Sequence, residues 1–224
     1  MATSSADKAE LLSTQFAKNS CLDDGGVTPP PFAQRTQETV PSPSISVKRV
    51  KHIIKCLDAS KSSGPDGIPV IVFKKLSPEL SPILSKLFSK CIDSGEFPTS
   101  WKIASVVPVP KKGCDSAQPS SYRPISLLPI AGKVFEALIN KTLVQFLERH
   151  ELLSDMQYGC RHSRSTGDLL SYVTDHISRV LDRQGETRSV ALDISKAFDK
   201  VWHQGLLTKL RSYGVSGQLH KLKA

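Results

Sequence analysis

The sequence predicts an α+β fold, and three observations lead to this prediction. Several separate segments carry apolar residues at every third or fourth position, which is the pattern of one buried helix face. Residues 101–109 alternate and are rich in β-branched side chains, which is typical of a strand. Residues 188–194 have the apolar centre of a short buried strand. The length of 224 residues is enough for one or two domains with a substantial core.

Residues 1–45 are expected to form a flexible N-terminal tail or linker, and residues 46–224 to form the folded domain. The Asp-Asp-Gly-Gly run at 23–26 and the three prolines at 29–31 interrupt any periodic pattern. A short helix fits residues 8–17, but nothing in the sequence obliges it to pack.

The first helix of the predicted domain should begin after Ser46, which can cap it, and should extend to about Leu57. A tight turn follows at residues 64–67, which read Gly-Pro-Asp-Gly. Residues 77–79 (Ser-Pro-Glu) then open a second helix, because proline is favoured at the first helical position. Gly95 is expected to end that helix.

The predicted strand at 101–109 leads into a Lys-Lys-Gly turn at 111–113. Residues 122–128 are expected to return as its hairpin partner across a long loop. Further helices are predicted over residues 132–149, 165–181 and 206–212.

The positive charge is unevenly distributed. The chain has 30 Lys+Arg and 21 Asp+Glu, a net charge of +9. Residues 1–50 hold five bases and five acids, so residues 51–224 hold 25 bases and 16 acids and carry all of the excess. This balance favours a polyanionic partner such as nucleic acid, and ordinary solubility is the alternative reading.

The five cysteines lie far apart and form no Cys-x-x-Cys pair. Their spacing argues against a zinc site and fits free thiols in a reducing compartment. The sequence shows neither a signal peptide nor an apolar run of about 20 residues that could span a membrane. We therefore expect an intracellular protein with no membrane partner.

The stretch at 190–203 carries the clearest chemistry. An apolar run, Val-Ala-Leu, leads directly into Asp193, and a second acid follows at Asp199. A carboxylate at the end of a rigid strand suits a hard cation such as Mg²⁺. The alternative is structural, with Asp193 capping the next turn and Asp199 pairing with a nearby lysine.

Five distinctive sequence motifs follow one another along the chain. They are 64–67 (GPDG), 107–113 (VPVPKKG), 121–129 (SYRPISLLP), 157–161 (QYGCR) with 164–166 (RST), and 192–203 (LDISKAFDKVWH). Together they resemble the reverse transcriptases of non-LTR retrotransposons, most closely the LINE-type, jockey-like group. The resemblance covers roughly Ser46 to the C-terminus.

The resemblance implies a right-hand polymerase fold, of which this chain would hold the fingers and the N-terminal part of the palm. It implies an RNA-directed DNA polymerase that adds dNTPs to the 3′ end of a DNA primer on an RNA template. The same family uses two metal ions, normally Mg²⁺, for nucleotidyl transfer.

The resemblance also implies roles for individual residues. Asp193 would bind metal through its carboxylate and Ile194 through its main-chain carbonyl, and Phe198 would crowd the sugar 2′ position. Residues that would bind the incoming triphosphate are Arg123 and one of the two lysines Lys111 and Lys112. Residues that would lie against the template are Gln157, Gly159 and Arg161. The structural alternatives are core packing for Phe198, solvated turn residues for the lysines and a plain polar loop for residues 157–161.

Two departures from the family pattern bear on activity. Cys160 stands where many members have phenylalanine, which affects template positioning. The family's later hairpin with two adjacent aspartates has no counterpart, since the chain's Asp-Asp pair is at 23–24.

We expect a fragment that is inactive alone. The alternatives are a non-catalytic nucleic-acid-binding fragment, a pseudogene product without a stable fold and a group II intron maturase. The sequence does not predict the oligomeric state.

Overall fold

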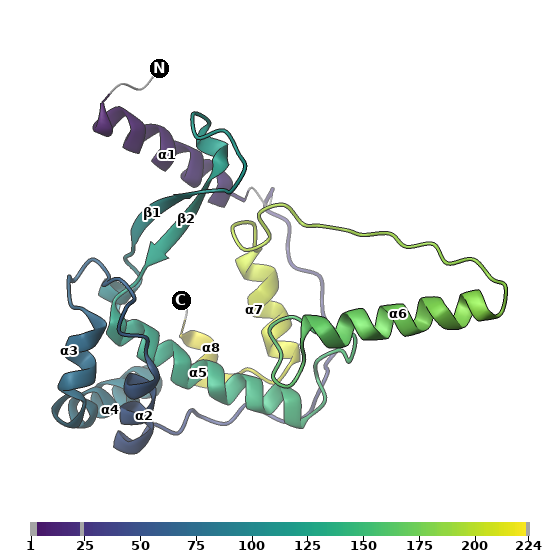
Figure 1. Ribbon diagram of the computed structural model, residues 1–224. Helices are drawn as coiled ribbons and strands as arrows, with labels where there is room; N and C mark the ends of the chain where they lie inside the picture. Colours follow the sequence, from purple (N-terminus) through teal and green to yellow (C-terminus); the bar gives the residue numbers. More distant parts are fainter. Residues whose placement is uncertain (1–3, 23–24, 223–224) are drawn as a thin grey trace.

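The computed structural model describes residues 4–22 and 25–222 (Figure 1). The helices are α1 (Ser5–Ser20), α2 (Val47–Cys56), α3 (Val70–Lys75), α4 (Ser77–Ser94), α5 (Ile130–Arg149), α6 (Thr166–Asp182), α7 (His203–Ser212) and α8 (Gly217–Lys221). The strands are β1 (Ser105–Pro110) and β2 (Tyr122–Leu127), and two 3-10 turns are η1 (Thr99–Trp101) and η2 (Pro119–Ser121). This combination of helices with a small sheet confirms the α+β prediction.

The main core lies between α2, α4 and α5. Val50 and Ile54 of α2, Phe88 of α4 and Phe135 of α5 are completely shielded from solvent. The rings of Phe88 and Phe135 stack with their centroids 5.0 Å apart, and the Trp101 ring meets Phe88 edge-on at 5.7 Å. Large aromatic side chains contribute much buried apolar area, so this cluster anchors the helical layer.

Two helix ends follow directly from the sequence. Ser46 caps α2, because its Oγ accepts a hydrogen bond of 3.3 Å from the backbone N–H of Arg49. Gly95 ends α4 with φ +70°, a left-handed conformation that glycine adopts without strain. The predictions for the start of α2 and the end of α4 are confirmed.

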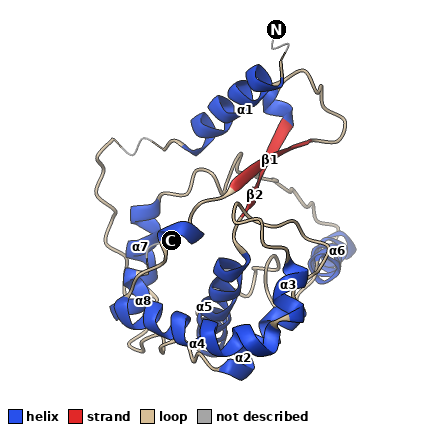
Figure 2. Ribbon diagram, turned by 90° about the vertical axis from the view of Figure 1, so that its left-hand side faces the viewer, coloured by secondary structure: helices blue, strands red, loops and turns tan. Residues whose placement is uncertain are grey.

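Strands β1 and β2 form the predicted antiparallel hairpin, with Ser105 opposite Leu127 and Pro110 opposite Tyr122. The predicted start of the first strand at residue 101 is wrong, because Trp101 ends the η1 turn and β1 begins at Ser105. The described chain adds no third strand to this sheet. Prolines at 108, 110 and 124 have no N–H to donate, which suits a ribbon that stays two-stranded. The hairpin rises from the helical layer, and α1 lies across its tip (Figures 1 and 2).

Residues between α1 and α2 contact the C-terminal part of the described chain. The backbone N–H of Arg35 donates to Ser212 O over 2.8 Å, and that of Val40 donates to Gly214 O over 2.9 Å. Gly214 has φ +85°, and a Cβ there would lie 2.3 Å from the carbonyl oxygen of Glu38. Glycine is therefore required for this close approach. The division of the chain at residue 45 stays a prediction.

Buried Val40 belongs to a second, smaller apolar cluster. Phe146 at the end of α5 and Val215 after α7 complete its buried part. This cluster joins the end of α5 to the segment that leads into α8.

The predicted strand at 188–194 is wrong, because the structure gives this segment no strand partner. Its apolar side chains lie in solvent, and Leu192 is 90% exposed. An extended segment needs a neighbouring strand to pair its backbone N–H and C=O groups. The β1–β2 hairpin is elsewhere and does not supply one.

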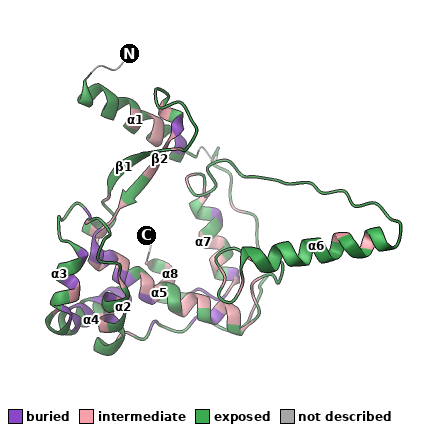
Figure 3. Cartoon of the chain, in the orientation of Figure 1, coloured by how far each residue is buried: buried purple, intermediate pink, exposed green. Residues whose placement is uncertain are grey.

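Helix α6 confirms the predicted helix at 165–181, although none of its residues is buried. Ser165 caps it: the Ser165 Oγ accepts a hydrogen bond from the backbone N–H of Asp168, and the Asp168 carboxylate accepts one from the backbone N–H of Ser165. Most of its apolar residues are exposed, and only Ile177 and Val180 are half-buried, as α6 extends away from the core (Figure 3). Helix α7 starts before the predicted residue 206, and α8 was not predicted from the sequence. No helix among the described residues is long and apolar enough to cross a membrane.

Candidate functional site

The hairpin carries the three basic residues that the sequence assigned to triphosphate binding. Arg123 faces Val109 across the two strands and is exposed. The Lys111 Nζ donates a hydrogen bond of 2.8 Å to Ser120 O, while Lys112 is exposed at the turn. Among the described residues none of the three makes an ion pair, so no neighbouring carboxylate neutralises the charge of Arg123 or Lys112.

The loop after α5 is organised around Arg161. The Arg161 Nε donates to Glu148 Oε1 over 3.0 Å, and its Nη2 donates to Glu148 Oε2 over 2.6 Å. The Arg161 Nη1 donates to Ser154 O over 2.7 Å. The Arg161 side chain is only 9% exposed, and its Nε, Nη1 and Nη2 all donate hydrogen bonds to protein atoms.

The same contact shifts the ionisation of both partners. Hydrogen bonding from Arg161, followed by its positive charge, holds the pKa of Glu148 below its ordinary value. The hydrogen bond to Glu148 correspondingly raises the pKa of Arg161. The sequence alone did not identify Glu148, because the partners lie 13 positions apart and share no periodic pattern.

A second arginine braces the other side of this loop. The Arg164 Nη1 donates to Asp155 O over 2.6 Å, and its Nη2 contacts Asp155 Oδ1 at 3.0 Å. The Arg164 guanidinium also lies 5.4 Å from the centre of the Tyr158 ring, within range of a cation–π contact. Gln157 and Gly159 are exposed between these two anchors.

The segment that contains Asp193 is open to solvent. Asp193 and Ile194 are exposed, and Phe198 is 92% exposed, so it makes no contribution to the core. The Lys196 Nζ donates a hydrogen bond to Asn19 Oδ1 at the end of α1. Helix α1 therefore contacts both this segment and the hairpin loop.

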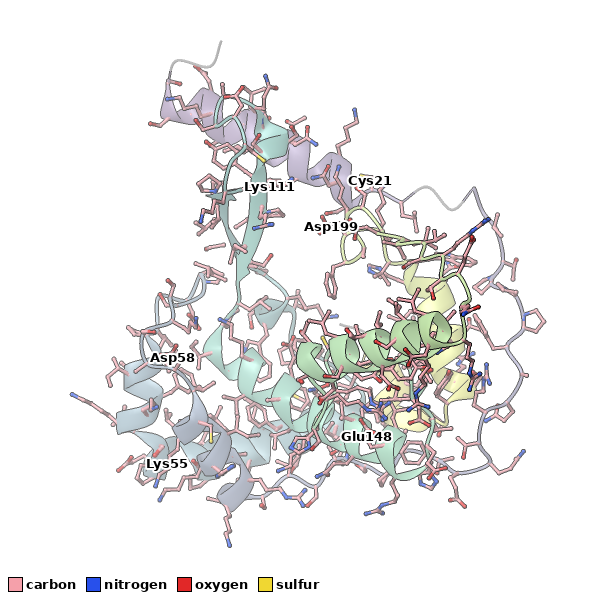
Figure 4. The ribbon with its side chains drawn as sticks, turned by 45° about the vertical axis from the view of Figure 1, so that its right-hand side comes forward. Cys21, Lys55, Asp58, Lys111, Glu148 and Asp199 are labelled. Carbon is pink, nitrogen blue, oxygen red and sulfur yellow. The ribbon has the colours of Figure 1, made fainter. Side chains whose placement is uncertain are left out.

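The structure brings the predicted site residues together only in part. Helix α1 links the hairpin to the segment around Asp193, and Figure 4 shows Lys111 and Asp199 at the end of the molecule where α1 lies. Glu148, which holds the loop at 157–161, lies at the far end of α5 (Figure 4). No hydrogen bond or ion pair joins Asp193 to Arg123 within residues 4–22 and 25–222.

Within the part of the chain that the structure describes, no group of three His, Cys, Asp or Glu residues is placed to hold a metal ion. Asp193 is exposed and belongs to no such group. Two metal ions need several oxygen ligands, so these residues alone do not fit a two-metal site.

Comparison with known proteins identifies the family. Residues 109–223 match the family model described as reverse transcriptase (RNA-dependent DNA polymerase). The chain is 33% identical over 185 residues to a probable RNA-directed DNA polymerase from transposon BS of Drosophila melanogaster. That alignment covers 80% of this chain and 20% of the relative.

Two further Drosophila melanogaster relatives agree. The RNA-directed DNA polymerase from mobile element jockey is 31% identical over 175 residues, covering 78% of this chain and 19% of the relative. The probable RNA-directed DNA polymerase from transposon X-element is 32% identical over 178 residues, covering 80% and 20%. The chain thus spans about a fifth of the length of these relatives. The resemblance inferred from the motifs is confirmed, and the chain belongs to the reverse transcriptase family, among those of non-LTR retrotransposons.

Proposed function

We propose that the chain forms the fingers and the first part of the palm of a right-hand RNA-directed DNA polymerase of a jockey-like retrotransposon. The full enzyme would transfer nucleotides from dNTPs to a DNA 3′ end on an RNA template, inside the cell. The observation that carries this proposal is the family match over residues 109–223, which includes the end of β1, all of β2 and the Asp193 segment.

The hairpin is the proposed triphosphate-binding element. Arg123 on β2 and Lys112 in the turn after β1 are exposed bases without an ion-pair partner in the described part, which suits a phosphate-rich ligand. Lys111 is tied to Ser120 O, so we assign it a supporting role in holding the turn.

Asp193 is the proposed contribution of this chain to the metal site. The family generally uses a divalent metal, but the described residues form no group of three or more ligating side chains. We propose that Asp193 and the main-chain carbonyl of Ile194 join carboxylates from elsewhere in the full enzyme. Phe198 is the proposed neighbour of the sugar 2′ position. With one carboxylate, the 224-residue chain alone is expected to give no primer extension.

A segment replacement tests the polymerase proposal. The chain would replace its aligned region in the jockey RNA-directed DNA polymerase, to which it is 31% identical. We expect the chimera to extend an oligo(dT) primer on poly(rA) with dTTP and Mg²⁺. Asp193→Asn should abolish extension, and Arg123→Ala should raise the KM for dTTP. A folded chimera whose extension survives Asp193→Asn would refute the assignment.

A non-catalytic RNA-binding role is the second candidate. The observation that favours it is the excess of 25 bases over 16 acids in residues 51–224. Salt-dependent RNA binding that survives Asp193→Ala would support this role, because phosphate contacts need no metal-binding aspartate. A chain that shows no cooperative unfolding transition would instead indicate a product without a stable fold.

A further inference from the structure

A groove of about 360 Å³ lies between α2 and α5. We call it the α2–α5 groove. It is lined by Ser44, Ser46, Lys48, Arg49, His52, Ile53, Leu138, Lys141, Thr142 and Gln145. None of the roles proposed above involves these residues.

The groove has a basic rim without a counter-charge. Lys48, Arg49 and His52 come from α2, Lys141 faces them from α5, and no acidic side chain lines the groove. The structure shows no ion pair for Lys48 or Lys141 in the described part of the chain. The Arg49 Nη1 donates to Ser44 O over 3.0 Å, which holds the arginine at the rim. Lys55, one turn further along α2, extends the charge.

The burial pattern of α2 explains why its charges face outward. Val50 and Ile54 anchor the helix in the core, so residues 48, 52 and 55 occupy the opposite face. Because the anchors are fully buried, the basic face is fixed in orientation rather than free to turn inward.

The interior of the groove differs from its rim. Ile53 and Leu138 provide apolar surface, and Ser46, Thr142 and Gln145 provide hydroxyl and amide groups. Apolar surface suits the face of a base, polar groups suit base edges and 2′-hydroxyls, and a basic rim suits phosphates. A single-stranded nucleotide matches this combination better than a lipid headgroup does, because headgroup binding needs only the charge.

The α2–α5 groove is remote from the hairpin, although its α5 side reaches Gln145, three residues before Glu148. Figures 1 and 2 place α2 at the opposite end of the molecule from the hairpin, and Figure 4 shows Lys55 far from Lys111. A strand bound in the groove would therefore be a different part of the RNA from the part at the hairpin.

We propose that the α2–α5 groove is a binding site for single-stranded RNA, separate from the hairpin, that reads phosphates with Lys48, Arg49 and Lys141. The proposal rests on the proposed function in one respect: the polymerase uses an RNA template, so we take RNA as the polyanion that binds in the groove. Its role is to hold a length of the RNA away from the site of synthesis.

The test measures binding of a fluorescent oligo(U) to the full chain at several salt concentrations. Lys48→Gln/Lys141→Gln removes two rim charges, and Lys75→Gln/Lys86→Gln removes two exposed charges from α3 and α4 as a matched control. We expect the groove variant to weaken binding roughly tenfold and to reduce the salt slope by about 1.4, at about 0.7 per phosphate contact. The control should change both quantities far less. Equal losses in the two variants would mean that only net charge matters and would overturn the proposal.

Crosslinking locates the bound strand. An oligo(U) carrying 4-thiouridine should crosslink to peptides that contain residues 44–55 or 138–145. Crosslinks confined to the hairpin would overturn the proposal, as would binding to phosphatidylserine vesicles without binding to RNA. If the chimera were inactive but the Lys48→Gln/Lys141→Gln variant still weakened RNA binding, only the polymerase function would be refuted. If the chimera were active but that variant bound RNA as well as the control does, only the groove proposal would be refuted.

Discussion

Arg161 and Glu148 form a two-pronged ion pair that ties the loop after α5 back onto that helix, with N···O distances of 3.0 and 2.6 Å. The resemblance implies that Arg161 touches the template. The structure instead directs its guanidinium at the protein, which leaves Gln157 and Gly159 as the exposed members of the predicted template set. We therefore assign Arg161 a positioning role, in which it fixes the loop that presents the other two.

Removing either partner of this pair is expected to have the same effect. Arg161→Ala and Glu148→Gln should each lower the melting temperature, and the double variant should be no less stable than the worse single variant, since one contact is lost in all three. The salt slope of RNA binding should stay within about 0.3 of its original value, whereas loss of a direct phosphate contact lowers it by about 0.7.

Arg179→Ala is the matched control for this experiment. Arg179 pairs with Asp175 one turn away on α6, but both side chains are more than half exposed. Exposed pairs contribute little, so the melting temperature should not change measurably. The positioning role would be contradicted if Arg161→Ala lowered the salt slope of RNA binding by about 0.7 while Glu148→Gln left it unchanged. Arg161 would then contact the template directly.

The ion pair also predicts a pH dependence. The pKa of Glu148 is lowered in the folded chain, so its stabilising effect is present above the unfolded pKa of about 4.3 and is lost as the pH falls through the folded pKa. The free energy of unfolding of the unchanged chain should therefore exceed that of Glu148→Gln at pH 6 and converge toward it in acid. Urea denaturation of both proteins between pH 3 and 7 checks this. A difference that stays constant over that range would contradict it.

Local signals were enough to predict much of the fold, and the exceptions have a common cause. Ser46 and Gly95 mark helix ends through contacts within a few residues, so the sequence predicts them. The hairpin follows from the β-branched residues of β1 and the Lys-Lys-Gly turn after it. The Arg161–Glu148 pair depends on how the chain turns after α5, and no local pattern encodes it.

The segment at 188–194 shows the converse limit. Its composition is that of a buried strand, but a strand exists only where a neighbour completes its hydrogen bonds, and no described segment does so. The sequence identifies the Asp193 carboxylate as a candidate metal ligand. The metal site also needs further ligands, and the described residues gather no group of three around Asp193.

Two phenylalanines offer a direct test of the core. Phe135 is fully buried and stacks on Phe88, so Phe135→Ala should reduce the free energy of unfolding by about 3–5 kcal/mol. Phe198→Ala removes the same atoms from a side chain that is 92% exposed and should leave stability nearly unchanged. Denaturant titration measures both. A large loss at Phe198 would mean that its segment packs in solution.

Thiol reactivity tests the placement of the five cysteines. Cys91 on α4 is buried, and burial raises the pKa of its thiol, which disfavours the reactive thiolate. The other four cysteines are exposed. A thiol reagent added to the native chain should therefore modify four cysteines rapidly, and the fifth should react only after denaturant is added. Mass spectrometry of the labelled peptides identifies each site, and Cys91→Ala should remove the slow phase alone. Rapid native labelling of Cys91 would show that α4 does not pack against α2 and α5 as the structure describes.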